Sequence, residues 1–173
     1  MSLAYGRPVR AIPGPSIIPD RVLSAMHRPA PNIYEGELIE ITASAAADLK
    51  RGAGTQHHLA MYIGNGHAAW EAALVNTVAP GEKVLVLLSG RFGLGWGEMA
   101  RTLGAEVEFL DGGTTAALDP ARLEARLRAD TAHEITSVLT VQTDTASSIN
   151  NDIPALAQAI RSAGHPALLQ VAC

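Results

Sequence analysis

The feature that most constrains the fold is a run of five apolar residues at positions 84–88, Val-Leu-Val-Leu-Leu. The turn residues Pro80 and Gly81 precede the run, and Ser89 and Gly90 follow it. A β-strand places successive side chains on opposite faces of its sheet, so an uninterrupted apolar strand needs cover on both faces. The run therefore predicts an interior strand of a mostly parallel sheet with helices on both faces.

The segments around this run alternate between strand and helix patterns. Helices are predicted at 21–27, 37–51, 67–78, 92–103, 120–129 and 153–163, and strands at 58–63, 84–88, 105–110, 136–141 and 167–171. This alternation is typical of the α/β class. The 30 alanines and the low aromatic content of 4% suit close packing of helices on a sheet.

The composition argues against several classes of protein. Hydrophobic residues make up 47% of the chain and charged residues 17%, which is a globular rather than a disordered composition. The formal net charge is −4 and the basic residues form no cluster, so we expect no nucleic-acid partner. No apolar run approaches the roughly 20 residues of a membrane helix, and no secretory signal is recognisable at the start. We expect a cytoplasmic protein without a membrane partner.

The segment 64–67, Gly-Asn-Gly-His, is the strongest candidate for a binding site. It lies between a predicted strand and a predicted helix, and its two glycines allow a tight turn. Free backbone N–H groups at the start of the helix favour an anion such as phosphate. The segment lacks the Gly-Lys-Ser/Thr of an ATP-binding loop, and Ala69 interrupts the dinucleotide pattern. The alternative is an ordinary glycine-rich turn.

Two further candidates follow predicted strands. The segment 143–148, Thr-Asp-Thr-Ala-Ser-Ser, offers hydroxyls and a carboxylate, and Phe92 and Trp96 offer flat rings. Loops that follow parallel strands share the carboxyl edge of the sheet, so we expect 64–67, 143–148 and Phe92 to meet there. The alternatives are a polar loop capped by its own side chains and, above all for Trp96, simple core packing.

Other chemistries find little support in the sequence. His57 and His58 are neighbours, so on a strand they would point to opposite faces, and no metal site is expected. The chain has no G-x-S-x-G elbow, and its one cysteine is Cys173, so nucleophilic serine or cysteine catalysis is poorly supported.

Seven stretches taken in order carry a resemblance to a known family. They are Gly14-Pro15-Ser16, GNGHAAWEAALVN at 64–76, PGEKVLV at 80–86, SGRFG at 89–93, TDTASS at 143–148, DIPAL at 152–156 and HPALLQV at 165–171. The set resembles the class V pyridoxal-phosphate aminotransferases, in particular their alanine–glyoxylate and serine–glyoxylate (serine–pyruvate) branch. The resemblance implies the N-terminal part of a fold-type I enzyme, with an N-terminal arm at 1–19 and a partial cofactor-binding large domain at 20–173.

The resemblance also implies pyridoxal 5′-phosphate as the cofactor. By position, Asn65, Gly66 and His67 match the loop that holds the phosphate. Phe92 matches the aromatic residue that stacks on the pyridine ring, and Thr145 matches the hydroxyl that bonds the ring's phenolic oxygen. The family more often has a hydroxyl residue where this chain has Asn65, and often has Trp where this chain has Phe92.

Other positions bear on catalysis. Gly14 and Pro15 match an arm segment near the substrate. Ala172 stands where the family has an Asp paired with the pyridine nitrogen. The resemblance implies that the Schiff-base lysine lies beyond the end of this chain. Neither lysine of the chain is expected to replace it, because Lys50 ends a surface-type helix and Lys83 precedes its strand, away from the cofactor loops. We therefore expect no catalytic residue within the 173 positions, and no small C-terminal domain.

The implied activity is transamination of a small amino acid, alanine or serine, with glyoxylate or pyruvate. The family resemblance further implies a homodimer. We expect this chain to be catalytically incomplete by itself. The alternative is a non-catalytic fragment, or a binding or interaction module that retains the fold. A different class V activity, such as a lyase or a sulfur-transferring enzyme, is a third interpretation.

Overall fold

The computed structural model describes Arg10, Ile12 and residues 14–173. The chain forms two compact units, Met1–Met61 and Tyr62–Cys173, and each has its own internal structure. Most of the arm predicted at 1–19 lies outside the described residues.

The first unit contains the two helices that the sequence predicts, α1 (Asp20–Met26) and α2 (Glu37–Gly52). Acidic residues in the first turn of α2 and basic residues in its last turn oppose the charges of the helix dipole. No residue of either helix is buried. Across the described part of the chain, no helix combines the length and the apolar character needed to span a membrane.

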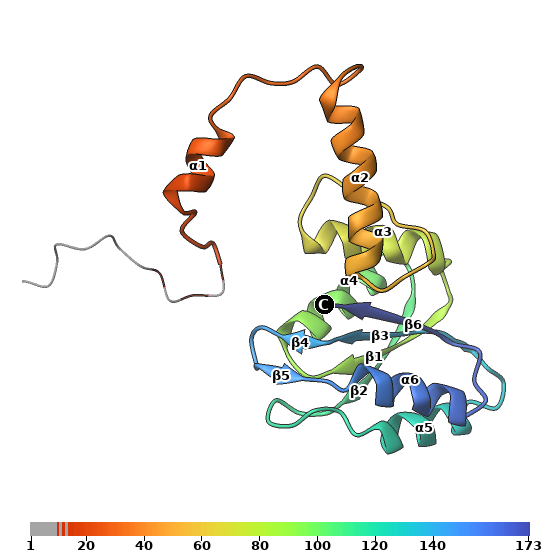
Figure 1. The fold of residues 1–173 in the computed structure, drawn as a ribbon. Helices are drawn as coiled ribbons and strands as arrows, with labels where there is room; N and C mark the ends of the chain where they lie inside the picture. The colour runs from red at the N-terminus through yellow and green to blue at the C-terminus, as the bar shows by residue number, and fades with distance from the viewer. Residues whose placement is uncertain (1–9, 11, 13) are drawn as a thin grey trace, which may run out of the picture. The chain divides into compact units, whose positions relative to one another are not determined.

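The second unit is built on a parallel four-stranded sheet in the order β2-β1-β3-β6 (Figure 1). Its strands are β1 (Lys83–Leu88), β2 (Glu106–Asp111), β3 (Ile135–Val141) and β6 (Leu168–Ala172). The apolar run at 84–88 lies in β1, an interior strand with a hydrogen-bonded neighbour on each side. The prediction drawn from that run is confirmed.

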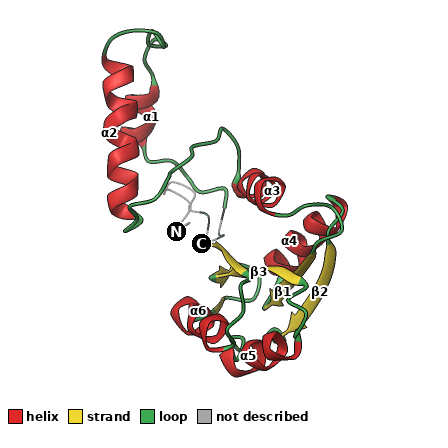
Figure 2. Cartoon of the chain, turned by 90° about the vertical axis from the view of Figure 1, so that its right-hand side faces the viewer, coloured by secondary structure: helices red, strands yellow, loops and turns green. Residues whose placement is uncertain are grey.

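Two pairs of helices cover the two faces of the sheet (Figure 2). They are α3 (Gly66–Thr77) and α4 (Arg91–Thr102) on one face, and α5 (Pro120–Ala129) and α6 (Ile153–Ser162) on the other. Val84 and Val86 pack with Trp70 and Trp96 of the first pair. Leu85 and Leu87 pack among the leucines of the second pair. The predicted α/β fold class is therefore confirmed.

One predicted strand is wrong. Residues 58–63 are irregular and pair with no strand of the described chain. Met61, Tyr62 and Ile63 are exposed. Their apolar pattern suits a strand, but a strand needs a neighbour to bond its N–H and C=O groups, and no strand of this sheet bonds to them.

The loop predicted at 142–151 also holds more structure than expected. It contains a small antiparallel hairpin, formed by β4 (Thr143–Asp144) and β5 (Ile149–Asn150). Strands of two residues carry too little periodicity to be recognised in a sequence.

At the amino edge of the sheet, a buried ionisable pair, Asp130 and His165, joins the segments that precede β3 and β6. The Oδ2 atom of Asp130 lies 3.1 Å from Nε2 of His165, and its two oxygens accept the N–H groups of Ile135 at 2.9 Å and Glu134 at 3.2 Å. The Nδ1 atom of His165 accepts the N–H of Ala167 at 3.1 Å. Burial by itself raises the pKa of Asp130, but the two backbone N–H groups and the His165 ring outweigh it and lower that pKa.

We predict that Asp130→Ala lowers the free energy of unfolding at neutral pH by about 2 kcal/mol, because buried N–H groups lose their acceptor. The pKa of Asp130 is lower in the folded chain than in the unfolded chain. Its contribution is therefore full above the ordinary aspartate pKa and is lost as the pH falls through the lowered value. Urea denaturation at neutral and acidic pH measures the effect. A difference between wild type and variant that does not shrink in acid contradicts this account.

Candidate cofactor site

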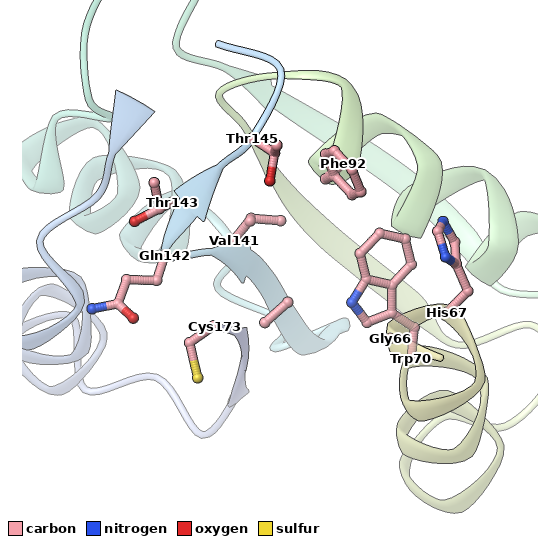
Figure 3. A pocket seen from close by; sticks show the side chains of 10 residues that line it. Gly66, His67, Trp70, Phe92, Val141, Gln142, Thr143, Thr145 and Cys173 are labelled. Carbon is pink, nitrogen blue, oxygen red and sulfur yellow. The ribbon is translucent and has the colours of Figure 1, made fainter. Parts of the chain in front are cut away.

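A cavity of about 360 Å³ opens at the carboxyl ends of β3 and β6 (Figure 3). Its lining residues are Gly66, His67, Trp70, Phe92, Val141, Gln142, Thr143, Thr145, Ala172 and Cys173. The loops at 64–67 and 143–148 thus meet at one edge of the sheet, with Phe92 beside them. The prediction that they share an edge is confirmed, whereas their binding roles stay predictions.

The start of α3 supplies free hydrogen-bond donors to this cavity. Asn65 is the N-cap residue, and its side-chain oxygen accepts the N–H of Ala68 at 3.2 Å. The N–H groups of Gly66 and His67 have no hydrogen-bond partner among the described residues. Two free N–H groups at the positive end of a 12-residue helix favour a phosphate. Asn65 does not line the cavity, because its side chain caps its own helix.

Aromatic rings form one wall of the cavity (Figure 3). The ring centroid of Trp70 lies 4.6 Å from that of His67, 6.1 Å from that of Phe92 and 5.6 Å from that of Trp96. Phe92 is half-buried and lines the cavity, whereas Trp96 is buried in the core. Sequence reasoning missed Trp70, although its position three residues after His67 on a helix places the two side chains on one face.

Two threonines flank the other side of the cavity. The hydroxyl of Thr143 accepts a hydrogen bond from the side chain of Asn150 at 2.8 Å. The hydroxyl of Thr145 has no partner among the described residues, and Figure 3 shows it directed toward the space beside Phe92. Thr145 therefore has a donor and an acceptor free for a bound molecule.

These residues fit part of pyridoxal 5′-phosphate. The helix terminus fits the phosphate, Phe92 offers a ring face, and Thr145 offers a hydroxyl for the phenolic oxygen. Among the described residues, the lining contains no Asp or Glu side chain for the pyridine nitrogen, and Ala172 forms the wall at the end of β6. Nor do the described residues place a lysine in the lining.

Lys83, the lysine of the second unit, lies away from the cavity, as expected from the sequence. Lys83 begins β1 at the opposite edge of the sheet and pairs with Glu134. The hydrogen bond to Glu134 raises the pKa of Lys83 and so favours its charged form. Lys50 belongs to the first unit, as do Gly14 and Pro15, which are exposed there. That Gly14 and Pro15 lie near the substrate stays a prediction.

No family model matches the chain. The chain is 37% identical over 167 residues to a serine–glyoxylate aminotransferase of Methylorubrum extorquens, an alignment that covers 96% of this chain and 42% of the relative. It is 33% identical over 161 residues to an L-aspartate–glyoxylate aminotransferase of Paracoccus denitrificans, which covers 92% of this chain and 41% of the relative.

A solved structure agrees with these relatives. The ureidoglycine–glyoxylate aminotransferase of Bacillus subtilis superposes with a TM-score of 0.83 and 25% identity, over 97% of this chain and 43% of that one. The chain therefore spans about two fifths of the length of the relatives it matches. The resemblance drawn from the sequence motifs is confirmed.

We predict that Asn65→Ala lowers the free energy of unfolding by about 1 kcal/mol, because α3 loses its side-chain cap. Asn65→Ser, which restores a capping oxygen, should recover most of this loss. Chemical denaturation of the three proteins measures both values. Equal losses for alanine and serine would show that the cap does not contribute to stability.

Proposed function

From the similarity of nearly the whole chain to part of several glyoxylate aminotransferases, we propose that it belongs to the class V pyridoxal-phosphate family and that its cavity binds pyridoxal 5′-phosphate. We further propose that the family's activity is transamination of a small amino acid, alanine or serine, with glyoxylate or pyruvate, and that these 173 residues are catalytically incomplete by themselves. One observation carries the proposal. A single cavity brings together a helix terminus, an aromatic wall and a hydroxyl, and the N–H groups and the hydroxyl have no partner in the described part of the chain.

Each group has a separate task in this proposal. The N–H groups of Gly66 and His67 bind the phosphate, and Asn65 keeps the helix start in place. Phe92 covers one face of the pyridine ring, and Thr145 bonds the phenolic oxygen. When bound, the cofactor supplies an electron sink that eases removal of a proton from the amino acid's α-carbon.

A second candidate function is a non-catalytic binding module that retains the fold. The specific observation in its favour is the cavity lining, which has Ala172 at the end of β6 and, among the described residues, no Asp, Glu or Lys side chain. A carboxylate beside the pyridine nitrogen would keep that nitrogen protonated and strengthen the electron sink. Under this alternative, the chain binds the cofactor without turning over a substrate.

The assembly and the organisation of the chain complete the proposal. Residues 1–19 form an N-terminal arm, residues 20–173 form a part of the large domain, and two copies associate in the cytoplasm. Ile12, Ile17 and Ile18 of the arm are 50%, 39% and 44% exposed. Covering their apolar surface stabilises an assembly by about 25 cal/mol per Å².

We predict that the chain binds pyridoxal 5′-phosphate and that inorganic phosphate competes with it. Phe92→Leu should weaken cofactor binding by about fivefold through loss of ring stacking, and should leave inorganic phosphate binding unchanged. Phe109→Leu is the matched control, because Phe109 lies on β2 and does not line the cavity. Equilibrium dialysis measures each affinity. Equal effects of the two substitutions would contradict the assignment of Phe92.

We also predict that the 173-residue chain shows no alanine–glyoxylate transamination, and that borohydride reduction with the cofactor labels neither Lys50 nor Lys83. The reason is that no lysine side chain lines the cavity within the described part of the chain. Mass spectrometry after reduction identifies any labelled lysine. Turnover together with a label on either residue would show that this chain is catalytically competent.

We predict a homodimer or larger assembly in which the arm packs on a neighbouring subunit. Replacing Ile17 and Ile18 by serine should shift the chain toward the monomer. Light scattering at micromolar concentration measures the mass. A stable wild-type monomer at that concentration would rule the assembly out.

A further inference from the structure

A buried carboxylate lies behind the wall of the cavity. Asp144 stands between Thr143 and Thr145 in the sequence, and both threonines line the cavity. The side chain of Asp144 is fully buried and is not itself part of the lining. Its Oδ2 atom accepts the N–H of Phe92 at 2.8 Å and the N–H of Gly93 at 3.2 Å. Its Oδ1 atom accepts the N–H of Ala146 at 3.0 Å. One side chain thus bonds the backbone of both loops that carry the cavity's ring and hydroxyl.

Helix α4, whose first turn contains Phe92, depends on this carboxylate. The N-cap residue of α4 is Gly90, which has no side chain to accept the first N–H groups. A Cβ atom at Gly90 would lie 2.3 to 2.6 Å from the carboxyl atoms of Asp144. Asp144 therefore occupies the place of a capping side chain, and its negative charge lies at the positive end of α4.

A second buried side chain also joins these loops, but at a different point. The Nδ2 atom of Asn151 donates to Oγ of Ser89 at 2.9 Å and to the carbonyl of Val141 at 2.8 Å. These bonds fix the ends of β1 and β3, before the chain reaches Phe92 and Thr145. The placement of those two residues relative to one another therefore depends on Asp144.

We propose that Asp144 is a positioning residue of the cofactor cavity. It acts through Phe92 and Thr145, because it holds the backbone of one loop against the other so that the ring and the hydroxyl face the same space. The hydrogen bonds of its side chain go to Phe92, Gly93 and Ala146, and none of these residues belongs to α3. This inference rests on the proposed function, namely that the cavity binds pyridoxal 5′-phosphate.

The ligand experiment uses the full chain and two ligands, pyridoxal 5′-phosphate and inorganic phosphate. We expect Asp144→Ala to weaken binding of the cofactor by about tenfold, and Asp144→Asn to weaken it less, because an amide oxygen still accepts the Phe92 bond. Binding of inorganic phosphate should stay unchanged in both variants, because α3 alone holds it. Calorimetric titration measures the four affinities.

The control variant is Asp111→Asn. Asp111 is the last residue of β2 at this edge and accepts a backbone N–H, that of Gly113 at 2.7 Å, but it is exposed and does not line the cavity. Its substitution should leave both affinities unchanged. A loss of cofactor and phosphate affinity by the same factor in Asp144→Ala would overturn the proposal, as would no loss at all.

A ligand-free experiment separates this inference from the proposed function. The backbone of Gly90 has a φ of 173°, which alanine adopts without strain, so Gly90→Ala reports on contact with Asp144. We expect Gly90→Ala to lower the Tm by about 5 °C and to change the near-ultraviolet circular dichroism of Phe92 and Trp70.

In a chain that already carries Asp144→Asn, we expect Gly90→Ala to change the Tm and the dichroism by a different amount than in the wild type. In a chain that carries Asp144→Ala, we expect Gly90→Ala to have almost no effect, because the carboxyl group that the new Cβ atom would meet is gone. Strictly additive effects on Tm and on the dichroism would overturn the positioning role. If the wild-type chain binds no cofactor, the proposed function fails. The double-mutant cycle of Gly90 and Asp144 then decides by itself whether Asp144 positions Phe92.

Discussion

Strand β1 has to be covered on both faces, because the fully buried side chains of residues 84–87 alternate across it. Cover on both faces requires helices that connect parallel strands, and such connections bring the chain back to the same edge before each new strand. Loops that follow the strands therefore collect at the carboxyl edge. The cavity exists where the loops after β1 and β3 and the start of α3 meet at that edge.

The two edges of the sheet use buried acids in different ways. At the amino edge, Asp130 and His165 satisfy one another and nearby backbone N–H groups, so this edge contributes stability. At the carboxyl edge, Asp144 also accepts backbone N–H groups, but none of its side-chain hydrogen bonds involves the start of α3 or a threonine hydroxyl. The N–H groups at the start of α3 and the hydroxyl of Thr145 are polar groups without a partner among the described residues. A bound phosphate ester with polar ring substituents would supply these groups with hydrogen-bond partners.

Local patterns in the sequence were enough for most of this architecture. The apolar run at 84–88 predicted an interior strand, and the rule that parallel strands end at one edge placed Phe92 beside Thr145. The strand predicted at 58–63 is wrong because strand formation depends on a neighbour, which a local pattern does not reveal. The role of Asp144 was equally out of reach, since its bond to Phe92 joins residues 52 positions apart. The position of Trp70, three residues after His67 in a predicted helix, could have identified it as a neighbour of His67.

A crystal structure of the chain grown with pyridoxal 5′-phosphate tests most directly whether the cavity binds this cofactor with its phosphate on the start of α3. We expect phosphate oxygens within hydrogen-bond distance of the N–H groups of Gly66 and His67, with the pyridine ring against Phe92. A cofactor bound at the other edge of the sheet, near Lys83, or density absent from the cavity at saturating cofactor, would contradict it.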